Sequence, residues 1–261
     1  MFPLKDSIGT ERTPVMTIAL ILANVVVFLL SIRHGGSIWS GPDNQTVVQY
    51  GAIPYEFSHY GKECDLVSSA GAVLCQGQPH VTGVPSSQPP TWFTAISSMF
   101  LHGGLLHIGG NMLFLWVFGN NVEDAMGRVK FVVFYMLGGF AATALQILVS
   151  TNATVPGIGA SGAVAAVLGG YLLLYPRARV LTLVFLFVFF TFIQIPAIFF
   201  LLIWFGQQVL FGYLNYADPT GGGGGVAYFA HIGGFLFGLL AIKAFATRYN
   251  PNYDRPRFPL Y

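Results

Sequence analysis

Apolar residues in this chain are gathered into long runs that are separated by shorter polar segments. The runs at residues 15–32, 131–150 and 226–246 are each long enough to cross a bilayer as a helix. The run at 105–119 is shorter, and the run at 160–175 is rich in Gly and Ala. We expect each of these five runs to be a membrane span.

One further run, residues 181–214, is too long for a single simple span and contains Pro196. It could form two spans, or one span preceded by a connection. With six spans and a cytoplasmic N-terminus, all Lys and Arg residues except Arg33 and Lys62 lie on the cytoplasmic side. Splitting the run would move the last four basic residues outside, against the positive-inside bias. We therefore expect a Phe-rich, membrane-skirting connection at 181–195 and span five at 196–213, with Pro196 in its first turn.

The composition agrees with a membrane protein. Hydrophobic residues make up 54% of the chain and charged residues 8%, whereas soluble domains carry about 25% charged residues. The mean hydropathy is +0.64. A net charge of +2 gives no indication of nucleic-acid binding. The fold class expected is an all-α membrane protein, a bundle of six transmembrane helices with a long first outer loop.

The chain divides into three parts on this prediction. Residues 1–14 form a cytoplasmic segment, and the span that follows has no small-residue cleavage site, so it should stay attached. Residues 15–248 form the six-helix domain, with an outer loop at about 34–98. Residues 249–261 form a cytoplasmic tail with too few apolar residues to pack, which we expect to be disordered.

The first outer loop contains both cysteines, Cys64 and Cys75. Two cysteines in one extracytoplasmic loop indicate a possible disulfide, and two free thiols are the alternative. Another outer loop carries five consecutive glycines at 221–225 and should be mobile.

Polar groups occur near the outer ends of three different spans. His107 and Asn111 are four residues apart and therefore share one helical face. Ser161 lies near the start of its span, where unpaired backbone N–H groups can stabilise an oxyanion. His231 is five residues beyond Val226, about 7–8 Å along a helix. Ionisable residues at membrane depth are functional candidates, and these groups share a similar shallow depth.

Small residues predict that spans four and six lie close together. Two stripes share helical spacing: Ser161, Ala165 and Gly169 on one span, and His231, Gly234 and Gly238 on the other. Such stripes let helix backbones approach closely in lipid, as a hydrogen bond from a Ser hydroxyl to a His nitrogen requires.

No acid is placed to complete a triad, because all ten Asp and Glu residues lie in loops, tails or helix ends. Asp218 is on the correct side but lies in the glycine-rich loop. We therefore expect a Ser–His dyad. A metal site is disfavoured, because His102 and His107 fall on different helical faces and no H-E-x-x-H motif occurs. No cofactor is expected.

Four blocks carry a family resemblance: His102-Gly103-Gly104-x-x-His107-x-x-x-Asn111, Gly119-Asn120-Asn121-Val122-Glu123-Asp124, Gly159-Ala160-Ser161-Gly162 and Ala230-His231-x-Gly233-Gly234. In this order, they resemble the rhomboid family of intramembrane serine proteases. The resemblance covers about residues 92–246 and, more weakly, the first span.

The resemblance implies a six-helix core with a water-filled cavity that is open to the outside. It implies Ser161 as nucleophile, His231 as general base, and the Ser161 N–H with the side chains of His107 and Asn111 as oxyanion donors. His102 matches a mainly structural position. Four glycines are expected to be structural residues near the site: Gly159, Gly162, Gly234 and Gly238.

The same resemblance implies transmembrane segments of other proteins as substrates, cut near their outer end. The partners expected are therefore such substrates and the lipid bilayer, and the oligomeric state is left open. Span five and the loop before span six would be the gate and the cap. The expected location is a bacterial cytoplasmic (inner) membrane, with both termini in the cytoplasm.

The chain departs from the family pattern in the outer loop and at one position below the nucleophile. Some members carry a Trp-Arg pair in the first outer loop, but here Trp92 is followed by Phe93. Some carry a Tyr one turn after the nucleophile that packs against the catalytic His, and here that position is Ala165. The loop segment that contains the cysteines is also outside the family's core pattern.

Two alternatives belong to other functional classes. The first is a non-catalytic relative that binds transmembrane helices, which the presence of both dyad residues opposes. The second is a proton-coupled transporter that uses His231 and His107 as a relay. Transporters of that kind often contain inverted repeats, and we see no repeat in this chain.

Overall fold

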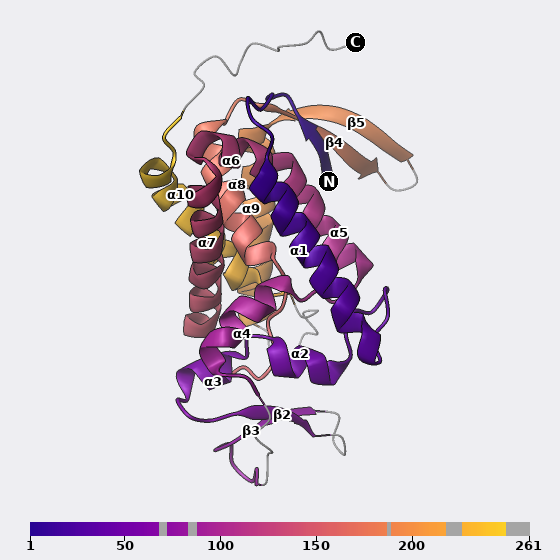
Figure 1. Cartoon of the computed structure of the whole chain (residues 1–261), viewed down its shortest axis with the longest axis vertical. Coiled ribbons are helices and arrows are strands. Elements are labelled where there is room, and N and C mark those ends of the chain that lie inside the picture. Colours follow the sequence, from indigo (N-terminus) through magenta and orange to yellow (C-terminus); the bar gives the residue numbers. More distant parts are fainter. Residues whose placement is uncertain (68–71, 83–87, 187–188, 218–225, 249–261) are drawn as a thin grey trace.

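The computed structural model describes residues 1–67, 72–82, 88–186, 189–217 and 226–248. Long helices run side by side between two ends of the molecule (Figure 1). The N-terminal strand and a hairpin lie at one end, and the segment that follows the first helix lies at the other. Several expectations lie outside the described residues: the mobile loop at 221–225 together with Asp218, and the disordered tail at 249–261.

Four described helices are long and apolar enough to cross a membrane. They are α1 (Val15–Ser31), α7 (Arg128–Val149), α9 (Ala197–Ala217) and α10 (Tyr228–Phe245).

A fifth crossing comes from a bent pair of helical segments. Thr91–Phe100, which contains α4 (Thr91–Ser97), meets Leu105–Met126 at 84°. The second segment runs without a break through α5 (Leu105–Phe114), the π-helical turn η3 (Leu115–Gly119) and α6 (Asn120–Met126). The last apolar helix, α8 (Ser161–Leu174), has 14 residues, or about 21 Å at helical rise. The described residues thus supply four or five candidate spans, and the count of six stays a prediction that depends on α8.

The described residues are mostly helical, as expected, but they also contain strands, so the fold is not purely α. The expected membrane-skirting connection at 181–195 was not predicted to contain strands, and its described residues lie in the antiparallel pair β4 (Arg179–Leu186) and β5 (Phe189–Pro196). The N-terminal β1 (Phe2–Asp6) pairs antiparallel with β4, which gives the sheet order β1-β4-β5. Phe, Val, Thr and Ile favour extended backbone, and β1 supplies a partner for the free edge of β4. Pro196 ends β5, so α9 begins one residue later than expected.

The segment that follows α1, which corresponds to the expected first outer loop and is called the outer segment below, has its own structure. It contains α2 (Asn44–Tyr50), α3 (Pro54–Ser58), and the paired strands β2 (Cys64–Val67) and β3 (Ala72–Cys75). A disulfide joins Cys64 to Cys75, and both are fully buried against Val48, Ile53 and Tyr55. This outer segment reaches the helical body through two hydrogen bonds between Ala52 and Gly157, of 2.9 and 2.8 Å. It therefore contacts the loop that leads into α8.

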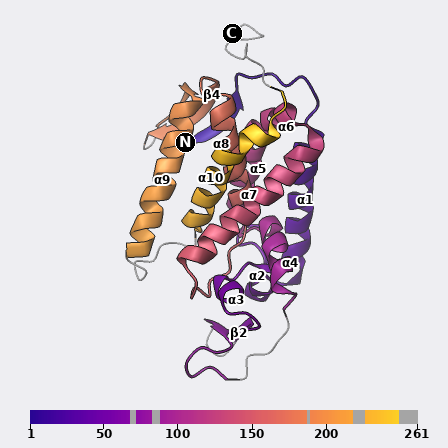
Figure 2. The same ribbon diagram turned by 90° about the vertical axis from the view of Figure 1, so that its left-hand side faces the viewer.

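Helix α8 is the central element, because 12 of its 14 residues are buried. It lies against α7 and α10, and α10 in turn lies beside α9 (Figure 2). A Cβ at Gly234 would collide with the carbonyl group of Gly162, and a Cβ at Gly238 with that of Ala166. A Cβ at Gly169 would meet the carbonyl of Phe235. The two helices thus approach to backbone contact along the two stripes of small residues.

Candidate active site

The first residue of α8 and the first turn of α10 meet at the end of the helical bundle that is opposite the sheet of β1, β4 and β5 (Figure 1). Ser161 begins α8, and His231 lies three residues after the start of α10 at Tyr228. The Ser161 Oγ and the His231 Nε2 are 2.7 Å apart, which is hydrogen-bond distance. Both side chains are partly exposed. His231 therefore lies nearer to its helix start than the sequence predicted.

Close helix contact holds this pair together. Gly234 is three residues after His231 and lies against the backbone of Gly162, the residue after Ser161. A Cβ at Gly162 would lie 2.5 Å from the Cβ of Ala142 on α7. A Cβ at Gly233 would meet α7 as well. Side chains at these positions would push α8 away from its neighbours and lengthen the Ser161–His231 distance.

The loop before Ser161 is fixed by backbone hydrogen bonds. The Gly159 N–H donates to the carbonyl of Ser98 at 2.8 Å, and the Ala160 N–H donates to His102 Nε2 at 3.4 Å. His102 is fully buried, so it braces this loop from inside the protein. Gly159 has φ of +119°, a conformation that favours glycine. A Cβ there would also lie 2.7 Å from the Nε2 of His107.

Two side chains on α5 direct N–H groups toward this loop. The Gly103 N–H donates to His107 Nδ1 at 3.2 Å, so a neutral His107 carries its proton on Nε2. The Asn111 side chain is 8% exposed, and its Nδ2 is buried without a hydrogen-bond partner among the described atoms. His107 Nε2 and Asn111 Nδ2 lie 2.7 and 3.6 Å from the position that a Cβ of residue 159 would take. The two donors therefore converge at Gly159, two residues before Ser161, and they line the same cavity as Ser161.

These groups open onto a cavity of about 370 Å³. Its polar lining consists of Ser161, His231, His107 and Asn111, and its apolar lining includes Phe114, Val164, Leu168 and Trp204. That volume lies within the range of pockets that hold small ligands or short peptide segments.

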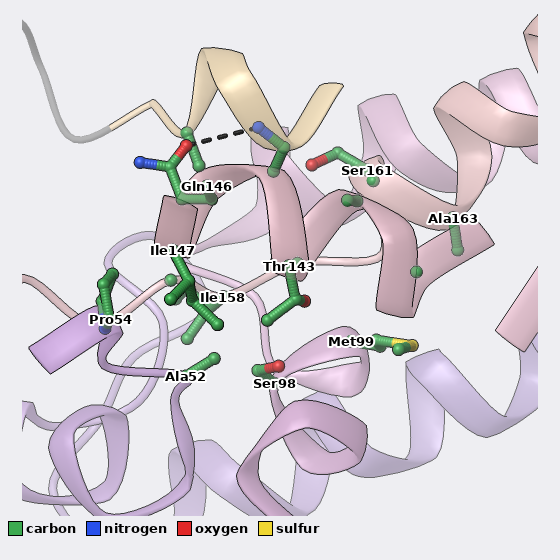
Figure 3. A pocket seen from close by; sticks show the side chains of 17 residues that line it. Ala52, Pro54, Ser98, Met99, Thr143, Gln146, Ile147, Ile158, Ser161 and Ala163 are labelled. Atoms are coloured by element: carbon green, nitrogen blue, oxygen red, sulfur yellow. Dashed lines mark hydrogen bonds between the residues drawn. The ribbon is translucent and has the colours of Figure 1, made fainter. Parts of the chain in front are cut away.

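A second, smaller cavity of about 50 Å³ lies on another side of Ser161, between α7, α10 and the outer segment. Figure 3 shows Ser98, Thr143 and Gln146 among the side chains around it. The Gln146 Oε1 accepts a hydrogen bond from the backbone N–H of Ala230 at 3.3 Å, drawn as a dashed line in Figure 3. This contact satisfies one N–H in the first turn of α10.

The sequence reasoning missed two contacts that α9 makes with His231. The ring of Trp204 lies 5.9 Å from the His231 ring, so α9 supplies an aromatic neighbour that Ala165 on α8 cannot. The Gln208 Oε1 lies 2.7 Å from His231 Nδ1, and Gln208 is buried. One signal could have located Gln208, because a polar residue within an apolar span is costly unless it has a partner.

The arrangement has the parts that acyl-transfer chemistry needs. A hydroxyl is hydrogen-bonded to an imidazole that can take its proton. Donors from α5 and the first turn of α8 surround the position next to that hydroxyl. Among the described residues, no group of three or more His, Cys, Asp or Glu side chains is placed to hold a metal ion.

The site lies within the part of the chain that matches a known family. The model of the Rhomboid domain matches residues 89–248, more than half of the chain. "Rhomboid protein 1, mitochondrial" of Saccharomyces cerevisiae is 36% identical over 94 residues, which cover 34% of this chain and 27% of that protein. "Rhomboid protease GluP" of Bacillus subtilis is 27% identical over 159 residues, which cover 61% of this chain and 24% of that protein.

A mammalian protein gives a match of similar extent. "Presenilin-associated rhomboid-like protein, mitochondrial" of Bos taurus is 30% identical over 144 residues, which cover 54% of this chain and 35% of that protein. The chain thus spans between 24% and 35% of the length of these three relatives. They include bacterial and mitochondrial proteins.

Proposed function

This chain belongs to the rhomboid family, and from that premise we propose that it is an intramembrane serine endopeptidase. Its substrates would be transmembrane segments of other membrane proteins, cut near their extracytoplasmic end. The observation that carries the proposal is the 2.7 Å contact between Ser161 Oγ and His231 Nε2 at the wall of a 370 Å³ cavity.

In the proposed first step, Ser161 attacks the carbonyl carbon of the scissile peptide bond while its proton passes to His231 Nε2. A serine hydroxyl is a weak nucleophile at neutral pH, so it needs such a base. The negative charge develops on the former carbonyl oxygen. His107 Nε2–H, the Asn111 side-chain amide and the Ser161 backbone N–H would donate to that oxygen.

In the next step, His231 gives its proton to the departing amine, and the acyl group stays on Ser161. Water then attacks the ester, with His231 again as the base. The reaction needs water inside a membrane protein. The position of the pair in the first turn of both helices supports access from the aqueous side.

The direct test uses the full chain in proteoliposomes with a labelled transmembrane substrate. We expect Ser161→Ala and His231→Ala each to reduce cleavage by roughly a thousandfold or more. Ser98→Ala and His34→Ala are matched controls, because Ser98 lines only the smaller cavity and His34 is exposed. Undiminished cleavage in either site variant would end the proposal.

A fluorophosphonate probe separates the proposed protease from the non-catalytic alternative. It should label the wild-type protein at Ser161 and fail to label Ser161→Ala. A chain that binds transmembrane helices but neither cleaves them nor takes up the probe would instead be a binding protein.

We also propose that both termini face the cytoplasm, as in a bacterial inner membrane. Basic residues in β1, at the start of α7, in β4 and near the end of α10 support this orientation, because these elements share one end of the molecule (Figure 1). A C-terminal fusion to a fluorescent protein should be fluorescent, and a fusion to alkaline phosphatase should be inactive. The reverse pattern would invert the orientation.

A further inference from the structure

A glutamine on α9 contacts the side of the His231 ring that faces away from Ser161. The Gln208 Oε1 and the His231 Nδ1 are 2.7 Å apart, as close as the Ser161 contact on the other ring nitrogen. Gln208 is 8% exposed, so little water competes for this hydrogen bond. The three side chains Ser161, His231 and Gln208 form a continuous chain of hydrogen bonds from three helices.

A second hydrogen bond fixes which atom of the Gln208 amide faces the ring. The Gln208 Nε2 donates to the backbone carbonyl of Trp204, one turn earlier on α9, at 3.2 Å. Rotating the amide by 180° would place its oxygen against that carbonyl, and two acceptors cannot bond to each other. The amide oxygen is therefore directed at His231.

The orientation of the amide sets the position of the proton on His231. An amide oxygen only accepts, so the Nδ1 of His231 must be the donor. A neutral imidazole carries one proton, which leaves Nε2 bare. A bare Nε2 is the form that can accept the hydroxyl proton of Ser161. The opposite tautomer would direct an N–H at Ser161 and could not act as its base.

We propose that Gln208 is a positioning residue that holds His231 in the Nδ1–H tautomer and directs its Nε2 at Ser161. This inference rests on the proposed function and deepens it. A serine protease triad uses a carboxylate for the same position. The amide of Gln208 is neutral, so it orients the ring without placing a negative charge in the membrane, where an ionised carboxylate is expensive.

The first test observes the tautomer without any activity measurement. Ring nitrogens of the full chain are labelled with ¹⁵N-histidine in lipid nanodiscs, and the His231 signals are assigned by their loss in His231→Asn. We expect a protonated Nδ1 and an unprotonated Nε2 in the wild-type protein at neutral pH. In Gln208→Leu the signals should become a mixture of both tautomers. A protonated Nε2 in the wild-type protein would overturn the inference.

The second test measures the consequence for the reaction. Gln208→Leu leaves the Nδ1–H of His231 without its buried acceptor. Gln208→Leu should therefore lower kcat for a transmembrane substrate about tenfold to a hundredfold, with KM unchanged. Labelling of Ser161 by the fluorophosphonate should slow to the same extent. The matched control is Gln207→Leu, an exposed glutamine on the same turn of α9, which should keep wild-type rates.

A conservative variant separates positioning from mere packing. Gln208→Glu keeps an acceptor at the same place and should recover most of the kcat that Gln208→Leu loses. Its carboxylate would also favour the charged imidazolium, so the acidic limb of the pH–rate profile should move to higher pH. A variant that only disturbed packing would change the rate without moving that limb.

The outcomes distinguish the two proposals. If the tautomer is as expected but no substrate is cleaved, the proposed function fails and the role of Gln208 in setting the tautomer stands. If cleavage depends on Ser161, but Gln208→Leu matches Gln207→Leu within twofold, the positioning role is wrong and the protease proposal stands. The wild-type spectrum decides the tautomer even if Gln208→Leu fails to fold.

Discussion

Two clusters of polar side chains lie toward opposite ends of this protein, and helix α8 contributes to both. The open cluster lies beside the 370 Å³ cavity and consists of Ser161, His231, Gln208, His107 and Asn111. The closed cluster lies near the sheet and consists of Asp6, Asn121 and Tyr171. Ser161 and Tyr171 are ten residues apart on α8, which corresponds to about 15 Å.

The closed cluster satisfies its own hydrogen bonds. One carboxylate oxygen of Asp6 accepts from the hydroxyl of Tyr171 at 2.6 Å and from the side-chain amide of Asn121 at 2.5 Å. These bonds attach β1 to α6 and α8. A similar closed arrangement holds the start of α1, where the carboxylate of Glu123 accepts from the N–H groups of Met16 and Thr17 at 3.0 and 2.7 Å.

The open cluster keeps one donor without a partner. The Asn111 Nδ2 is buried beside the cavity and makes no hydrogen bond among the described atoms. A buried, unpaired donor costs about 1–3 kcal/mol. A buried polar group can thus either bond to another element and join the two, or stay unpaired until a substrate supplies its partner. A closed cluster should therefore govern stability, and an open cluster should govern activity.

We expect the largest effect from removing the unpaired donor of the open cluster. Asn111→Ala should lower kcat about 100- to 1000-fold, the usual loss for one oxyanion donor. Its melting temperature should stay close to the wild-type value, because the amide donor has no partner to lose. Cleavage in proteoliposomes and thermal unfolding in detergent measure the two quantities.

The matching change in the closed cluster is the control. Asn121→Ala should lower the melting temperature, because it removes a donor to buried Asp6. The rate per folded molecule should stay near the wild-type value. If Asn111→Ala kept full activity, or if both variants showed the same pattern, the distinction between the clusters would be wrong.

The next effect concerns the contact between α8 and α10 beside the open cluster. Gly234→Val would drive a side chain into the backbone of Gly162, and overpacking of this kind costs about 1–3 kcal/mol. We expect a lower melting temperature together with slower cleavage, because the Ser161–His231 distance would grow. Gly206→Val is the control, since no atom lies within 4 Å of the Cβ position at Gly206. Equal behaviour of the two variants would argue against close contact between α8 and α10.

A smaller effect should follow from pH at the closed cluster. Burial raises the pKa of Asp6 to about 7, from 3.8 in an unfolded chain. Between about pH 4 and about pH 7, Asp6 is therefore protonated in the folded state and ionised in the unfolded state. Docking of β1 is strongest below about pH 4 and weakens as the pH rises to about 7. The equilibrium constant for release of β1 should increase by up to about tenfold per pH unit in this range.

Hydrogen exchange of the β1 amides, corrected for the intrinsic dependence on pH, measures this release. Protection should fall between pH 5 and pH 7 in the wild-type protein. Asp6→Asn cannot ionise, so its protection should be independent of pH. Protection that rises with pH in the wild-type protein would contradict a raised pKa at Asp6.

The smallest expected effect comes from one hydroxyl. Tyr171→Phe removes one of the two side-chain donors to Asp6 and should cost about 1 kcal/mol of stability. Thermal unfolding of this variant can be compared with Tyr213→Phe, whose ring is exposed on α9. Cleavage should be unchanged in both variants. A loss of activity in Tyr171→Phe at full stability would mean that the closed cluster acts on the site.

Local sequence patterns predicted the helices well and the sheet poorly. The apolar runs at 15–32, 131–150 and 226–246 each coincide with a long apolar helix whose ends differ from those of the run by a few residues. The hairpin of β4 and β5 was missed because its residues are as apolar as those of a span, and pairing with β1 adds a third strand to it. That pairing joins residues such as Phe2 and Leu183, which no local pattern connects.

The candidate site shows the same division. The sequence alone indicated a candidate site, through the spacing of His107 and Asn111 and the small residues around Ser161 and His231. Gln208 carried no such pattern, because a single glutamine in an apolar helix does not say which residue it will face. Its bond to His231 depends on how α9 docks against α10, 23 residues along the chain.

The order of residues along the chain was sufficient to predict apolar membrane helices and to indicate which of them carry reactive groups. Hydrophobic length and helical spacing are local properties, so they can be read residue by residue. Only the tertiary structure decided that a hydroxyl and an imidazole 70 residues apart come within 2.7 Å, and that a third helix orients the imidazole. Such contacts form when entire helices pack against each other. The free energy that favours one packing is distributed over many small residues along the helix–helix contacts.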